Sequence, residues 1–266
     1  MWRSLRAHWP EYVMEGAELA IFMILAGGFA TLYFAEASPI AKGLPNALCQ
    51  RLVMGLTMGC CAIAIIYSPW GKRSGAHFNP AVTLAFYRLG KLTPWDGAFY
   101  ILAQFLGGTV GIAIATLLFG DPFTHLPVHY IITVPGVAGW PAAVLAEAIM
   151  AFGLMGMVLL VSNHPKLHPF TGWFAGGMVA LFVLFAAPIS GTSLNPARTF
   201  ASGLAAQVWT AFWIYALVPP LAMLAAAELY QRGFRAAPRA ICGKLCPNSD
   251  TPCPFIDCPC GAPPSR

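Results

Sequence analysis

The tripeptide Asn-Pro-Ala occurs twice in this chain, as Asn79-Pro80-Ala81 and as Asn195-Pro196-Ala197. Proline suits the first position of a helix because its missing N–H would have no partner there, and the residue before proline is kept out of the helical region. Asparagine before the proline caps the helix with its side-chain oxygen, which leaves its NH₂ group able to donate elsewhere. Each tripeptide therefore predicts the start of a helix with a hydrogen-bond donor at its tip.

The helices that these tripeptides begin are too short to cross a bilayer, so each is predicted to enter it from one side. If the two meet N-terminus to N-terminus, each contributes about half a positive charge from its aligned peptide dipoles. Cations, including protons on a water chain, would be repelled there, whereas neutral molecules could accept hydrogen bonds from Asn79 and Asn195. The small residues before each tripeptide are expected to line this path with their backbone, namely Gly75, Ala76, His77, Gly191 and Ser193.

The composition requires a lipid environment around these elements. Of 266 residues, 58% are hydrophobic and 9% charged, against roughly 25% charged in a soluble domain. The net charge of +5 does not indicate nucleic-acid binding, because the basic residues form short clusters between apolar runs rather than a stripe with aromatic residues. Backbone groups in lipid must be satisfied within the protein, so the apolar runs are predicted to be helices, near residues 13–34, 51–68, 95–119, 141–162, 170–189 and 207–230.

The two halves of the chain repeat one pattern. Ala17-Glu18 precedes the first tripeptide as Ala146-Glu147 precedes the second, and each half holds three spans, so the second half must insert inverted relative to the first. The predicted fold is an all-α membrane protein with six transmembrane helices and two re-entrant half-helices. Its predicted parts are a cytoplasmic N-terminus (1–12), a channel domain (13–232, with repeats at about 13–120 and 141–232) and a Cys/Pro-rich cytoplasmic tail (233–266), expected to be disordered.

The positive charges predict the orientation of these spans. Most lysines and arginines precede the first span, follow even-numbered spans or lie between spans two and three, whereas the other side holds only Lys42, Arg51 and Arg198. This asymmetry places both termini in the cytoplasm and is consistent with a multi-pass protein of the cell membrane.

From about residue 10 to residue 232 the chain resembles the major intrinsic protein family, the aquaporins and glycerol facilitators. The resemblance rests on residues 74–83 and 195–200, together with Ala103-Gln104, residues 213–215 and Pro219. It implies a passive channel for water and small uncharged solutes such as glycerol, urea or metalloid acids. It also implies a homotetramer without a cofactor, and no catalytic residues.

The resemblance also implies a narrow filter formed by Met58, Val183, Thr192 and Arg198. The second-span position is open between Met58 and Gly59. Water channels of the family usually carry an aromatic residue and a histidine where Met58 and Val183 stand, and glycerol facilitators usually carry aspartate in place of Thr199. The motifs thus resemble those of a water channel, whereas the filter residues predict an opening wider than that of a water channel.

Two groups of residues permit a second interpretation. The main alternative is a secondary transporter, in which Glu18 and Glu147 could carry protons. They are instead expected to accept hydrogen bonds from the loops that contain the two Asn-Pro-Ala tripeptides. An intramembrane enzyme is not favoured, because no acid, nucleophile or metal-ligand pair accompanies His77. No metal site is expected in the channel.

Five cysteines crowd the tail: Cys242, Cys246, Cys253, Cys258 and Cys260. A cytoplasmic location argues against disulfides, whereas clustered thiols can bind a soft metal or a trivalent metalloid, although the spacing matches no familiar zinc motif. The other interpretation is a dispensable tail. On either one, removing the tail is expected to leave water flux intact.

Overall fold

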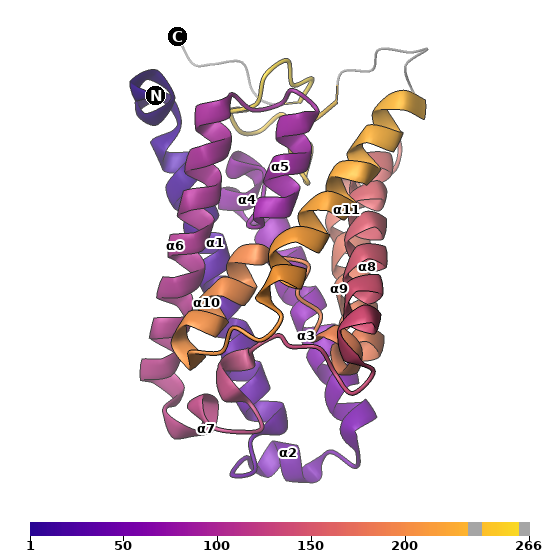
Figure 1. Cartoon of the computed structure of the whole chain (residues 1–266). Helices are drawn as coiled ribbons and strands as arrows, with labels where there is room; N and C mark the ends of the chain where they lie inside the picture. The colour runs from indigo at the N-terminus through magenta and orange to yellow at the C-terminus, as the bar shows by residue number, and fades with distance from the viewer. Residues whose placement is uncertain (234–240, 261–266) are drawn as a thin grey trace.

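The computed structural model describes residues 1–233 and 241–260. Within these residues the fold is all-helical, and six helices are long and apolar enough to span a bilayer, which confirms the predicted fold class. The six are α1 (Trp2–Phe34), α3 (Ala47–Tyr67), α6 (Pro94–Phe119), α8 (Gly139–Ser162), α9 (Thr171–Ser190) and α11 (Phe212–Gly233). Figure 1 shows that α1 begins and α11 ends on the same side of the molecule, which we call the terminal face.

The first helix extends further than the predicted first span. It includes most of residues 1–12, which were predicted to precede the channel domain, and has a kink at His8 (φ −127°, ψ 17°). Pro10 lies in the next turn; a proline inside a helix removes one backbone donor and crowds the preceding turn, which accounts for the kink.

Two short helices complete the inverted repeat. They are α5 (Pro80–Arg88) and α10 (Pro196–Ala206), with 9 and 11 residues. At 1.5 Å per residue each is about half as long as the roughly 30 Å hydrocarbon core of a bilayer. Helix α10 packs against α6 and α5 packs against α11, so each half-helix contacts the third span of the other repeat. The half-helices therefore tie the two repeats together.

Small residues allow the long helices of the two repeats to approach closely. A Cβ atom added to Gly59 of α3 would lie 2.5 Å from the carbonyl oxygen of Gly176 in α9, and one added to Gly176 would lie 2.5 Å from the carbonyl oxygen of Gly59. Glycine contacts of this kind are typical of helix pairs in membranes. Gly59 consequently faces α9.

The connections contain short helical turns. These are α2 (Pro39–Gly43), α4 (Pro69–Ser74), α7 (Asp121–Thr124), η1 (His129–Ile131) and η2 (His168–Phe170). Figure 1 places α2 and α7 at the end of the molecule opposite the terminal face, and α4 near the terminal face.

The tail segment, residues 241–260, packs on the terminal face, where it is drawn in yellow in Figure 1. Leu245 and Phe255 are buried in the same apolar core as Phe86 and Tyr100. The backbone N–H groups of Leu245 and Ile256 donate to the carbonyls of Gly75 and Lys91. The predicted disorder is therefore wrong for residues 241–260, because these apolar side chains find a core to enter. Residues 234–240 and 261–266 lie outside the described part of the chain.

Candidate functional site

The two Asn-Pro-Ala tripeptides meet through their asparagines. The Oδ1 of Asn79 accepts from the N–H of Ala81 (2.9 Å), and that of Asn195 accepts from the N–H groups of Ala197 (3.0 Å) and Arg198 (3.2 Å), so both cap their helices as predicted. Each Nδ2 also donates across the junction, Asn79 to the carbonyl of Leu194 (2.9 Å) and Asn195 to that of Phe78 (2.8 Å). An amide NH₂ has two hydrogens, so one donor per asparagine has no such partner in the loops.

The loop before each tripeptide has an unusual backbone that repeats between the halves. Positive φ angles occur at Ala76 (55°) and Phe78 (30°), and again at Thr192 (53°) and Leu194 (53°). Non-glycine residues rarely adopt this region, and such positions cost energy unless their surroundings fix them. The two loops must therefore be held by strong contacts from the helices around them.

In the second repeat this contact is Glu147 of α8. Its Oε1 accepts hydrogen bonds from the hydroxyl of Ser190 (2.8 Å) and the N–H of Ser193 (2.9 Å), and its Oε2 accepts from the N–H of Leu194 (2.8 Å). The carboxylate is fully buried. Its oxygens are thus committed to the loop, which is the structural role predicted from the sequence rather than proton transport.

In the first repeat the equivalent contact is made chiefly by Glu15, which the sequence reasoning missed. Glu15 accepts from the N–H groups of His77 (2.9 Å) and Phe78 (2.6 Å). Glu18, the predicted acid, accepts only from the hydroxyl of Ser74 (2.8 Å), and its second oxygen has no hydrogen-bond partner. Glu15 and Glu18 together accept the hydrogen bonds that Glu147 accepts alone in the second repeat. They can do so because residues three apart lie on the same face of a helix.

A further pair of contacts repeats with the same symmetry. The hydroxyl of Tyr100 in α6 donates to the carbonyl of Ser74, and that of Tyr215 in α11 donates to the carbonyl of Ser190, both at 2.7 Å. Gln104 donates to both Glu15 (2.8 Å) and the hydroxyl of Thr83 (3.0 Å). These contacts fix the ends of the two loops against the third span of each repeat.

A cavity of about 370 Å³ runs between the repeats. It extends from Phe34, at the end of α1 opposite the terminal face, to Leu245 in the tail segment, and both tripeptide asparagines line it. The structure places all four predicted filter side chains on its wall, namely Met58, Val183, Thr192 and Arg198. The sequence left Met58 and Gly59 open; Met58 lines the cavity, whereas Gly59 faces α9.

Arg198, which directly follows the second Asn-Pro-Ala tripeptide, places a positive charge on the wall of this cavity. Its Nη1 donates to the carbonyl of Ile131 (2.8 Å), which holds the guanidinium at the cavity. The hydroxyl of Thr192 donates to the carbonyl of Phe182 (3.2 Å). A second arginine that the sequence analysis did not assign to the pore, Arg51, also lines the cavity and donates to the carbonyl of Leu184 (3.2 Å).

The predicted backbone positions divide into two groups. His77, Gly191 and Ser193 line the cavity, whereas Gly75 and Ala76 do not. The carbonyl of Gly75 accepts the N–H of Leu245 in the tail segment (3.0 Å). These two positions therefore do not belong to the cavity wall in this structure, and at Gly75 the tail segment takes the carbonyl that was expected to face the permeating molecule.

The tail cysteines also differ from the prediction. Cys242 and Cys260 form a disulfide, contrary to the expectation that a cytoplasmic tail contains none. Cys246, Cys253 and Cys258 are free thiols. The sulfurs of Cys242, Cys258 and Cys260 form a cluster, which Cys246 does not join.

The fold and site together define a membrane pore built from inverted repeats around two capped half-helices. Comparison with known proteins agrees: a family model described as major intrinsic protein matches residues 4–230. The chain is similar to aquaporin NIP1-4 of Oryza sativa subsp. japonica (36% identity, covering 78% of this chain and 75% of the relative). It is also similar to aquaporin TIP4-4 of Zea mays (34% identity, covering 87% and 95%).

A solved structure has the same fold. The aquaglyceroporin from Plasmodium falciparum aligns with a TM-score of 0.67 at 21% identity, over 85% of this chain and 96% of that one. This chain belongs to the major intrinsic protein family. It is a multi-pass integral membrane protein and a channel for water and small neutral solutes, not an enzyme.

Proposed function

We propose that this channel passes water together with at least one larger uncharged solute, such as glycerol, urea or an undissociated metalloid acid. The observation that carries this proposal is the wall around Arg198, where Met58 and Val183 stand on the same cavity. Neither side chain can donate or accept a strong hydrogen bond, and methionine is flexible enough to move aside. Pore diameter and lining donors set what a channel admits, so this opening suits solutes with one polar edge and one apolar face.

Within this proposal Arg198 provides the polar edge of the filter. A guanidinium has five N–H donors, and one of its nitrogens is committed to the carbonyl of Ile131. The remaining donors are available to a hydroxyl or carbonyl of the solute. Thr192 contributes little, because its hydroxyl donates to Phe182. The filter is therefore one-sided: donors on one wall and an apolar surface on the other.

The same geometry supports exclusion of protons and ions. The positive ends of the dipoles of α5 and α10 meet at Asn79 and Asn195, and Arg198 adds a full positive charge on the same cavity. A permeating cation meets both. The side-chain oxygens of Glu15 and Glu147 face the loops rather than offering a relay for protons, which argues against the transporter alternative.

The proposal extends to the setting of the channel. The terminal face is the cytoplasmic side, as the basic residues indicate, and the protein acts as a homotetramer in the cell membrane with one pore in each subunit. Mass measurement of the purified protein in detergent tests the tetramer; a monomer under conditions that preserve flux would contradict it.

Stopped-flow light scattering of proteoliposomes tests the solute proposal. Vesicles that contain the protein are mixed in turn with impermeant osmolyte, glycerol, urea and an undissociated metalloid acid. We expect fast water flux and a measurable permeability to at least one of the three solutes, compared with empty vesicles. Rapid water flux without any solute flux would show that the filter is narrower than Met58 and Val183 imply.

Replacing Val183 with histidine is expected to reduce solute permeability more than water permeability. The larger ring narrows the opening and adds a hydrogen-bonding group to its apolar wall. The same swelling assay measures both permeabilities, and Val179→His, on another position of α9 that lines the cavity, is the matched control. An equal loss of water and solute flux in Val183→His would contradict the assignment of Val183 to the filter.

A further inference from the structure

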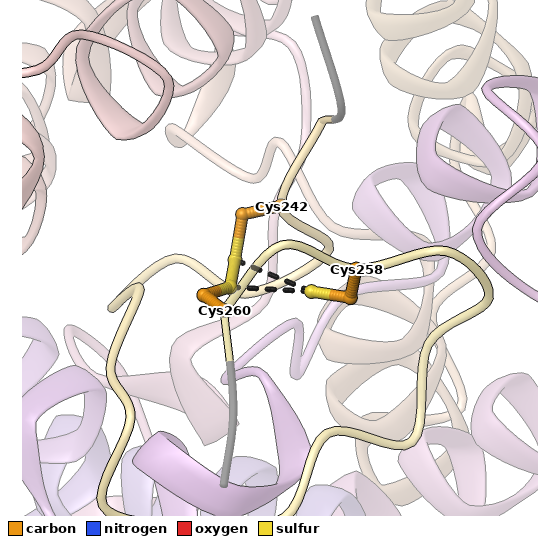
Figure 2. Close-up of side chains that lie close together, drawn as sticks. All are labelled: Cys242, Cys258 and Cys260. Atoms are coloured by element: carbon orange, nitrogen blue, oxygen red, sulfur yellow. Dashed lines mark hydrogen bonds between the residues drawn. A yellow bond between two sulfur atoms is a disulfide. The ribbon is translucent and has the colours of Figure 1, made fainter. Parts of the chain in front are cut away.

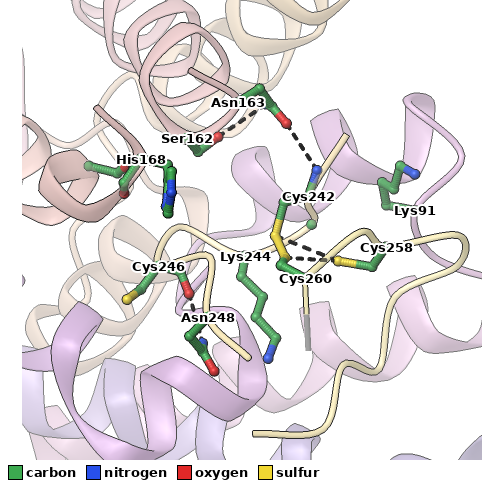
Figure 3. Close-up of a disulfide and its surroundings, with 12 residues drawn as sticks. Lys91, Ser162, Asn163, His168, Cys242, Lys244, Cys246, Asn248, Cys258 and Cys260 are labelled. Atoms are coloured by element: carbon green, nitrogen blue, oxygen red, sulfur yellow. Dashed lines mark hydrogen bonds between the residues drawn. A yellow bond between two sulfur atoms is a disulfide. The ribbon is translucent and has the colours of Figure 1, made fainter. Parts of the chain in front are cut away.

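A cluster of cysteine sulfurs lies in the tail segment on the terminal face (Figure 2). The Sγ of Cys258 lies 3.6 Å from that of Cys242 and 3.2 Å from that of Cys260, and these two are joined as a disulfide. The thiol of Cys253 interacts with that of Cys258 and is the candidate fourth ligand, although its sulfur lies outside the group of three that are all within 4.8 Å of one another. Figure 3 shows Cys246 apart from the other sulfurs, with its side chain directed away from them.

The spacing of these sulfurs matches what a metal ion requires. A tetrahedral zinc site has Zn–S bonds of about 2.3 Å, which places neighbouring sulfurs about 3.8 Å apart. The distance from Cys258 to Cys242, 3.6 Å, is close to this value, and that from Cys258 to Cys260, 3.2 Å, is shorter. Once the Cys242–Cys260 disulfide is reduced, its two sulfurs can move apart to about 3.8 Å, the separation in a tetrahedral zinc site. This movement would open a position for an ion among the sulfurs.

The surroundings favour thiolates over thiols. Lys244 is fully buried beneath the cluster, and its ammonium donates to the carbonyl of Pro252 (2.9 Å) and the hydroxyl of Thr251 (2.9 Å). A positive charge beside cysteine sulfurs favours the thiolate, which is the form that binds metals.

We propose that Cys242, Cys253, Cys258 and Cys260 form a binding site for one thiophilic divalent cation, of which Zn²⁺ is the typical case, when the protein is reduced. Two electrons and two protons from a dithiol reductant convert the Cys242–Cys260 disulfide into two thiols, and the reductant becomes its own disulfide. The cation then displaces the thiol protons as its bonds to sulfur form. The disulfide is the oxidised form of the same site, which a reducing compartment would disfavour.

Cobalt titration of the full-length protein in detergent tests this site. The protein is reduced with a trialkylphosphine, which takes up oxygen from water as the disulfide becomes two thiols, and the phosphine is removed. We expect one Co²⁺ per chain with the absorption of a tetrahedral thiolate complex, displaced by one equivalent of Zn²⁺. Protein that has not been reduced should lack this absorption.

Single serine variants locate the ligands. Cys258→Ser should weaken Zn²⁺ binding roughly a hundredfold or more, because the site loses one of four ligands, whereas Cys246→Ser is the matched control and should bind like the unmodified protein. Elution as a single species in detergent confirms that each variant is folded. Absence of the thiolate absorption from reduced protein, or equal weakening in both variants, would overturn the proposal.

A second observation concerns what the tail segment covers. Leu245 lines the pore cavity, and the Nε2–H of His77 donates to the carbonyl of Gly243 (2.9 Å). The ring of Phe255 stacks on that of His77 with a centroid distance of 5.2 Å. The tail segment thus contacts the loop before Asn79, at the end of the cavity that lies toward the terminal face.

We infer that residues 241–260 restrict flux by covering this end of the pore. The inference rests on the channel function but not on the metal site, because the contacts of Leu245, Gly243 and Phe255 do not involve sulfur. It replaces the expectation that the tail can be removed without effect on water flux.

Truncation after Gly233 tests the cover in the swelling assay. Water permeability per channel should rise severalfold, because the entrance is open, and Leu245→Gly should reproduce part of the rise. Ile256→Gly is the matched control, since this side chain is exposed on the same segment. Equal water flux through full-length and truncated proteins would contradict the inference that the tail segment restricts flux, but not the channel function. Absence of flux in both proteins would contradict the channel function itself.

Discussion

Replacing Glu147 with leucine is expected to abolish flux and to remove most of the folded protein from the membrane. Three donors lose their acceptor, namely the hydroxyl of Ser190 and the N–H groups of Ser193 and Leu194. A buried donor without a partner costs about 1–3 kcal/mol, so the loss is on the order of 3–9 kcal/mol. Folded proteins are stable by only about 5–15 kcal/mol, and the strained loop conformation depends on these bonds.

The measurement is the yield of monodisperse protein in detergent, followed by water flux of any that is recovered. The first repeat offers a matched comparison. Glu15→Leu should behave like Glu147→Leu, because Glu15 holds the N–H groups of His77 and Phe78. Glu18→Leu should be milder, since only Ser74 donates to Glu18. If Glu18→Leu proves as damaging as Glu15→Leu, the assignment of the loop contact to Glu15 is contradicted.

Replacing Arg198 with valine is expected to raise the leak of protons and small cations by roughly ten- to a thousandfold. A unit charge about 4 Å from a permeating cation opposes it by about 4 kcal/mol at an effective dielectric constant near 20, which corresponds to about three powers of ten in rate. The dipoles of α5 and α10 remain in the variant, so the lower end of this range applies if they dominate.

Proton leak is measured in proteoliposomes with an internal pH-sensitive dye under an imposed potential, and water flux in the same vesicles shows that the pore is intact. Arg198→Lys is the control, because it keeps the charge but loses the planar group that donates to Ile131. If the charge at position 198 forms the barrier, the Arg198→Val protein should leak protons, and the Arg198→Lys protein should leak far less. Unchanged leak in a folded, water-conducting Arg198→Val protein would place the barrier at the half-helix dipoles or at Arg51, the other arginine that lines the cavity.

Much of this molecule follows from local sequence signals. The two Asn-Pro-Ala tripeptides fix the half-helix starts, because capping and the exclusion of helix before proline act within a few residues. Long apolar runs fix the six spans, since a bilayer accepts few other structures. The repeat of these signals in two halves with three spans each determines the inverted architecture. Arg198 was assigned to the filter by the resemblance of residues 195–200 to the family, not by spacing alone.

Other features depended on which surfaces meet in space. Glu15 and Glu18 lie on one helix face, so their spacing could not decide which of them holds the loop; the position of His77 and Phe78 beside α1 decides it. Likewise Met58 and Gly59 are adjacent in sequence, and the packing of α3 on α9 turns one toward the cavity and the other toward Gly176.

The tail segment depended most on tertiary structure. Its proline-rich composition is typical of disorder, yet Leu245 and Phe255 are buried among side chains from α5 and α6, and the disulfide joins residues 18 apart in sequence. Composition records how many apolar and thiol groups a segment has. Only the folded chain determines whether a surface exists nearby that can bury the apolar groups and bring the sulfurs together.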